Sequence, residues 1–180
     1  MSEFRICSYQ EAMDGEFGAG ASDKSPSGWL TGHHLIPDHC FFYTGGLRGK
    51  GDVSGFLIPV LKGTRYTEAS APVILLSSDH FGAPTHNHKK AHDVFDPIEN
   101  EFGRNQGNEW TFADAVEASV KSLKIFGVED AVRKELKKYF MDGLGLDNES
   151  ILRAGNSGKA MKSYTVPSRP KRYAPRHAPY

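Results

Sequence analysis

The chain has 180 residues, of which 38% are apolar, and its 22 basic and 22 acidic residues give a formal net charge of zero. That length suits one domain, alone or with tails. Proteins that bind many phosphates are usually basic overall, and this chain is not. There is no run of about 18 apolar residues and no hydrophobic core of a signal peptide, so neither a membrane span nor a cleaved leader is expected. Two cysteines, Cys7 and Cys40, cannot form a zinc-finger set, and a largely reducing compartment is the simpler expectation.

The first third of the chain predicts little regular structure. Residues 1–28 are rich in glycine, serine and acids, and they are predicted to form an irregular arm. Residues 29–37 (WLTGHHLIP) form a short apolar stretch, which predicts a strand that ends at Pro37. The aromatic run Phe41-Phe42-Tyr43 is expected in the core.

The middle of the chain predicts two strands and then a helix. The strands are expected at 56–61 and 73–76, the second a continuous apolar run. A helix is expected to begin near Pro84, with Thr85 as its N-cap, and to carry the histidines that follow. Pro97 is expected to end or restart it, with a loop at 103–108.

Two further helices are predicted from apolar stripes, and both are expected to serve as scaffold. The first stripe follows Thr111, a suitable cap, and the second follows the break at Gly127; they comprise Phe112, Val116, Val120 and Leu123, then Val128, Val132, Leu136 and Tyr139. The domain is therefore expected at 29–142. Residues 143–180 are expected to form a Pro-rich tail, basic and free of acids from Arg169 onward, with at most one short helix.

Histidines are the most informative residues, because seven of the eight fall between His33 and His92. His88 and His92 are four residues apart, so on a helix they share a face and can reach one ion. The doublet His33-His34 lies on a predicted strand, where neighbouring side chains point to opposite faces. One member can bind metal while the other contacts solvent or substrate. The pattern predicts a metal-dependent hydrolase site.

These motifs resemble a known family. Gly32-His33-His34 with Leu35-Ile36-Pro37, and the run from Thr85 to Asp93 (THNHKKAHD), are similar to the GHH-type toxin nucleases of the HNH/endonuclease VII superfamily, found in bacterial polymorphic and type VI secretion systems. The resemblance covers roughly residues 28–140. The stretch 45–66 departs from it, because it lengthens the loop between the two matching motifs. The resemblance implies an α+β fold with a ββα-metal, treble-clef-like core and trailing helices.

What the resemblance implies for the site is one divalent ion held by His33, His88 and His92, with His34 as the general base. A metal-bound imidazole has already donated its lone pair and cannot act as the base. Further candidates for a ligand or a phosphate contact are His80, His86 and Lys89, and His86 is an alternative to His88 because helix boundaries are uncertain. The metal stays open among Zn, Ni, Mn, Co and Mg. His39 and His177 receive no role.

The function implied is a metal-dependent, largely non-specific DNA endonuclease that acts as an interbacterial toxin. It would leave the producing bacterium without a signal peptide, through the type VI route and with a carrier or chaperone, and act in the target-cell cytoplasm. An acidic immunity protein is the expected partner. Two alternatives stay open: RNA as the substrate of the same site, and a histidine-rich module whose zinc is structural and closed by a fourth protein ligand.

Overall fold

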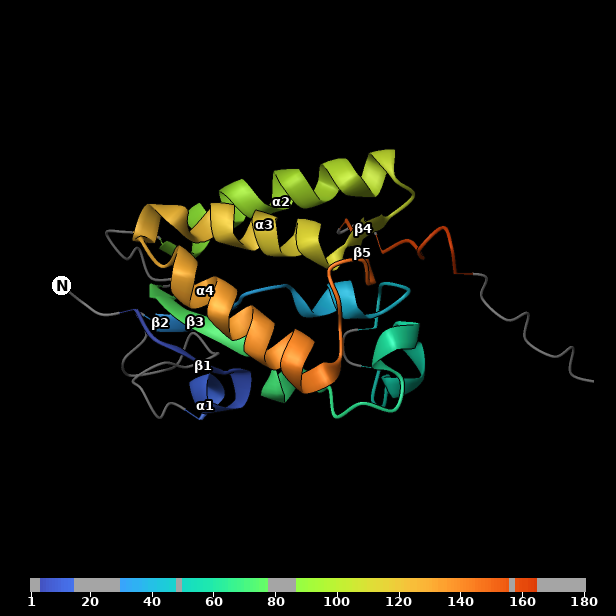
Figure 1. Cartoon of the computed structure of the whole chain (residues 1–180), viewed down its shortest axis with the longest axis horizontal. Coiled ribbons are helices and arrows are strands. Elements are labelled where there is room, and N and C mark those ends of the chain that lie inside the picture. The colour runs from blue at the N-terminus through green and yellow to red at the C-terminus, as the bar shows by residue number, and fades with distance from the viewer. Residues whose placement is uncertain (1–3, 15–29, 48–49, 78–86, 156–157, 165–180) are drawn as a thin grey trace, which may run out of the picture.

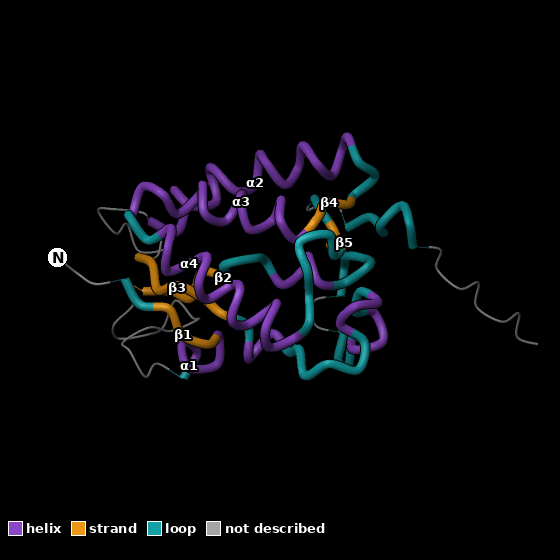
Figure 2. Tube along the Cα trace, in the orientation of Figure 1, coloured by secondary structure: helices purple, strands orange, loops and turns teal. Residues whose placement is uncertain are grey.

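The computed structural model describes residues 4–14, 30–47, 50–77, 87–155 and 158–164 (Figures 1 and 2). Its strands are β1 (Ile6–Ser8), β2 (Leu30–His34), β3 (Pro72–Ser77), β4 (Glu109–Thr111) and β5 (Ile151–Arg153). Its α-helices are α1 (Tyr9–Met13), α2 (Asn87–Asn105), α3 (Phe112–Leu123) and α4 (Glu129–Leu136). Short 3-10 helices lie at Asp38–Phe41, Ser54–Phe56, Pro59–Leu61, Glu68–Ser70 and Lys124–Phe126, and a π-helical segment follows α4 at Lys137–Gly143. The expected α+β class is confirmed.

The three-stranded sheet has β3 at its centre, with β1 and β2 antiparallel on either side. Side chains of β3 alternate between two apolar environments: Ile74 belongs to the main core, whereas Val73 packs with α1. A strand that is buried on both faces is expected to read as a continuous apolar run, which is why the prediction of a strand at 73–76 is confirmed. The register pairs His33 with Ile74 and His34 with Val73. Paired residues share a face, so the two histidines face opposite layers.

The helices form a layer over the main core. In Figure 1, α2 and α3 lie side by side, and α4 crosses below them toward the sheet. Thr111 caps α3 as predicted, in a capping box with Asp114. The second predicted helix is also present, as α4 and its π-helical continuation. Trp110 of β4 packs against the helix layer: it is 1% exposed, and its ring contacts that of Phe95 on α2 edge to face.

Two predictions in the middle of the chain are wrong. Residues 56–61 do not form a strand; two 3-10 helices lie there, and the only pairing described is a single bridge between Phe42 and Leu57. Proline at position 59 has no N–H for a sheet ladder, which accounts for the difference. Pro97 does not end α2, which runs on to Asn105 and into the predicted loop. Buried residues on both sides of the proline, Phe95 and Glu99, hold the helix against the core.

The ends of the chain contribute more structure than expected. Within the predicted irregular arm, Ser8 begins α1 with a capping box to Glu11, and the strand before it pairs with β3. Within the predicted tail, β5 pairs with β4. Thr85, the predicted cap of α2, lies outside the described residues, and both cysteines are free thiols. Among the described helices, none combines the length and apolar character needed to cross a membrane.

Candidate metal centre

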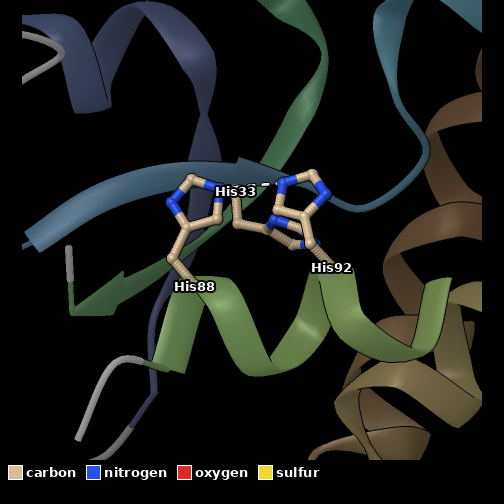
Figure 3. Close-up of side chains that lie close together, drawn as sticks. All are labelled: His33, His88 and His92. Carbon is tan, nitrogen blue, oxygen red and sulfur yellow. Dashed lines mark hydrogen bonds between the residues drawn. The ribbon is translucent and has the colours of Figure 1, made fainter. Parts of the chain in front are cut away.

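Three histidines from β2 and α2 converge on one point (Figure 3). His33 points from the strand toward the helix because its register puts it on the main-core face, and it is only 4% exposed. His88 and His92 stand one turn apart on α2, with their Nε2 atoms 3.1 Å from each other. The His33 ring lies edge-on to both, with centroid distances of 4.9 Å. One ring nitrogen from each of the three lies within 4.8 Å of the others.

The far nitrogens of the two helical imidazoles are held by neighbours. Nδ1 of His88 lies 2.6 Å from the hydroxyl of Thr31, and Nδ1 of His92 lies 2.9 Å from a carboxylate oxygen of Asp96. Such partners fix the ring and leave the opposite nitrogen for a metal. Bonds of about 2.0–2.1 Å in a tetrahedral zinc site put neighbouring ligand atoms about 3.3–3.4 Å apart, close to the separation seen between the two Nε2 atoms.

The electrostatics of the centre keep its buried ligand neutral. Burial lowers the pKa of His33 well below its ordinary value, and the neighbouring imidazoles of His88 and His92 lower it further. A neutral imidazole retains the lone pair that binds a metal, whereas an imidazolium does not. The donor set, three imidazoles with two of their outer nitrogens already anchored, therefore fits a divalent ion that accepts nitrogen ligands.

His34 lies on the opposite face of β2 and does not join the three. Its ring packs on Tyr9 of α1, with a centroid distance of 4.7 Å. Burial is the main cause that lowers its pKa to about 4, with smaller contributions from the charges of His39 and His88. Its Nε2 atom is buried and has no hydrogen-bond partner among the described residues. Near neutral pH His34 is therefore a neutral imidazole.

A cleft of about 880 Å³ brings the four histidines into one site. Its walls include His33, His34, His88 and His92, together with two residues to which the sequence assigned no role, His39 and Arg153. The doublet reaches the same cleft from two faces because it stands at the end of β2, where the chain turns away from the sheet. Three convergent ligands and a separate imidazole thus share one opening.

Of the remaining predicted residues, the structure describes Lys89 alone. His80 and His86 lie outside the described residues. Lys89, a predicted phosphate contact, forms hydrogen bonds of 2.7 Å with both carboxylate oxygens of Asp93 and does not line the cleft. Its charge is therefore directed to a neighbour on α2.

A second polar cluster was missed by the sequence analysis. Glu99 is 1% exposed, and its Oε1 accepts hydrogen bonds from Nε2 of His39 at 2.5 Å, from the thiol of Cys40 at 3.6 Å and from the amide of Gly155 at 3.0 Å. Arg153 is also buried, and its guanidinium donates to the carbonyls of His39 and Gly155, among others. The one signal in the sequence was the place of Glu99 on α2, seven residues after His92 and therefore on the same helix face.

His39, Cys40 and Glu99 also stand close enough to hold an ion. Burial, and then the charge of Glu99, raise the pKa of the Cys40 thiol well above its ordinary value, so the thiol keeps its proton. Three donors already satisfy the carboxylate oxygen, and the cluster is complete as a hydrogen-bond network.

Comparisons with protein-family models, with curated proteins and with solved structures find no match for this chain.

Proposed function

We propose that the protein is a metal-dependent endonuclease that hydrolyses DNA phosphodiester bonds with little sequence preference. The observation that carries the proposal is the arrangement of four imidazoles at one cleft. The imidazoles of His33, His88 and His92 converge. The imidazole of His34 is separate and neutral, and its Nε2 atom has no hydrogen-bond partner among the described residues. A hydrolase needs a ligand set and a free base, and this site supplies both.

The topology supports the same assignment. The first strand of the unit carries the doublet, the second pairs with it antiparallel, and the helix that follows carries the other two ligands. This order of β2, β3 and α2 is that of the ββα-metal nucleases, which the sequence motifs resemble. We therefore place the chain, as a proposal, with the GHH-type toxin nucleases.

The residues of the chain divide the chemistry between them. When bound by the three imidazoles, a divalent ion supplies a Lewis acid that neutralises charge on the phosphate as the leaving alkoxide forms. His34 accepts a proton from the attacking water, a task that requires a neutral imidazole at working pH. Its depressed pKa keeps it in that form. Thr31 and Asp96 keep the rings of His88 and His92 oriented.

The decisive experiment incubates supercoiled plasmid with the purified protein, with EDTA and with added Zn, Ni, Co, Mn or Mg. Nicking followed by degradation, blocked by EDTA and restored by at least one metal, is expected. Equal treatment of a structured RNA tests the alternative substrate: metal-dependent loss of RNA with intact plasmid would transfer the proposal to RNA. Bound metal with neither activity would identify a structural zinc module instead.

The biological setting proposed is that of an interbacterial toxin with a cognate immunity protein. Such a partner must recognise local charge, because the net charge of the chain is zero. The later helices offer exposed cations for an acidic partner, namely Lys121, Lys124, Lys134 and Lys137. Expression of the wild-type chain in bacterial cytoplasm is expected to arrest growth with loss of the nucleoid, and His34→Ala to relieve it; unimpaired growth at high expression would refute the toxin role.

A further inference from the structure

His39 stands at the same cleft as His34 but in a different environment. It belongs to the 3-10 helix Asp38–Phe41, which follows directly on the buried segment after β2. Its side chain is 31% exposed and lines the cleft wall. The two imidazoles are near enough for the charge of His39 to act on His34. The cleft therefore presents two imidazoles that are not part of the convergent three.

Glu99 fixes the orientation of His39. The carboxylate is buried on α2, and the atom that accepts the imidazole Nε2–H also accepts the Gly155 amide, which anchors it to the segment after β5. A buried carboxylate in this position holds the imidazole in one orientation and fixes which of its two nitrogens faces the carboxylate. Nδ1 of His39 is then the nitrogen left for the cleft, which His39 lines. The buried Nε2 atom of His34, by contrast, has no hydrogen-bond partner among the described residues.

We propose that His39 is a second catalytic imidazole, the general acid that protonates the leaving oxygen, and that Glu99 is its positioning residue. The inference rests on the proposed phosphodiesterase function and assigns a further role within it. One site can combine acid and base chemistry when two titratable groups lie in different environments. Here the base is His34, and the acid is His39, whose Nε2 atom is held by a carboxylate.

In the proposed hydrolysis step, one proton passes to His34 and one leaves His39. Water loses a proton to His34 as its oxygen bonds to phosphorus, and the bond from phosphorus to the leaving oxygen breaks with its electron pair remaining on that oxygen. That oxygen takes the Nδ1 proton of His39, which enters the step doubly protonated and keeps its Nε2–H on Glu99 as it becomes neutral. The products are a phosphate monoester and an alcohol, and the two imidazoles return to their starting states by proton exchange with solvent.

The test compares two substrates that differ in leaving group. A DNA oligonucleotide releases a poor leaving alkoxide that needs a proton, whereas bis(p-nitrophenyl) phosphate releases p-nitrophenolate, which does not. The variants are His39→Gln, which keeps the side-chain volume but cannot act as an acid, and His34→Ala as the comparison. For each, kcat on both substrates, the metal stoichiometry and the thermal midpoint are measured with the full chain.

For His39→Gln we expect kcat on DNA to fall by about 100- to 10,000-fold, and the loss on DNA to exceed the loss on the ester by at least about 100-fold. His34→Ala is expected to lower kcat on both substrates by similar factors. Glu99→Gln should show the same selective loss at about one tenth of the size, with metal stoichiometry retained. Equal losses of His39→Gln on both substrates, or none on DNA, overturn the inference while leaving the nuclease intact. A wild-type protein that cleaves neither substrate defeats the proposed function, and this inference with it.

Discussion

Replacing Thr31 by valine isolates the contribution of a single hydroxyl to the metal centre. Thr31 lies on β2, two residues before His33, and its Oγ1 is 2.6 Å from Nδ1 of His88. When the Nε2 atom of His88 binds a metal, its Nδ1 carries the proton and donates to this oxygen. Valine keeps the shape and the strand preference of threonine but cannot accept that hydrogen bond.

The expected loss follows from the burial of the two anchoring contacts. Loss of a group that orients a metal-bound histidine typically lowers metal affinity by about 10- to 100-fold, or about 1.4–2.7 kcal/mol. The contact of Thr31 is partly buried, so Thr31→Val should fall within this range. Asp96 is 48% exposed, and water can replace its carboxylate. Asp96→Asn should therefore lower the metal affinity less, by about 10-fold.

The assay is a competition titration of Zn²⁺ or Co²⁺ against a chelator of known affinity, with unfolding in urea as the check on folding. Thr31→Ser is the matched control, because it retains the hydroxyl and should stay within about three-fold of the wild-type affinity. An unchanged affinity in a folded Thr31→Val protein, or equal losses in the valine and serine variants, would show that the hydroxyl does not orient His88.

Four further outcomes are expected. His34→Ala should keep one metal ion per chain yet lose plasmid cleavage, whereas His92→Ala should lose both; metal loss in a folded His34→Ala protein would reverse the division of roles within the doublet. Gly32→Val should lower the free energy of unfolding by about 1–3 kcal/mol, because a β-carbon there would lie 3.1 Å from side chains of α1 and β3; Gly55→Val, with open space around it, is the control. Phe140→Ala should lower it by about 3–5 kcal/mol, since the ring is fully buried among aromatic neighbours; a loss under about 1 kcal/mol in urea unfolding would contradict this. A co-purified acidic immunity protein should associate more slowly as salt rises, and a rate independent of salt would exclude charge attraction as the basis of encounter.

The candidate ligands could be predicted from sequence because local geometry decides their relation. Residues four apart on a helix share a face, and neighbours on a strand do not, whatever the rest of the chain does. His88 with His92, and His33 opposite His34, follow from those two periods alone. The helix after Thr111 was equally predictable, since its cap and its apolar stripe are both local signals.

The short elements could not be predicted in the same way. Strands β1 and β5 have three residues each, too few to show an alternating pattern, and they form because a strand distant in the sequence, β3 for β1 and β4 for β5, supplies the hydrogen bonds. The 3-10 helices at 54–61 depend on where the surrounding loop closes. Sequence periodicity shows which face of a segment is apolar. It does not show which distant segment will pair with it, and these short elements depend on that pairing.

The polar cluster behind the cleft was decided by tertiary structure alone. His39 and Glu99 are 60 residues apart, and Gly155 is a further 56 residues along the chain, yet all three meet at one carboxylate oxygen. In the sequence, His39 is an isolated histidine and Glu99 a charged residue on an amphipathic helix. A carboxylate is stable in the core only where donors from several segments surround it, and the packing of α2 against the segments around His39 and β5 brings those donors together.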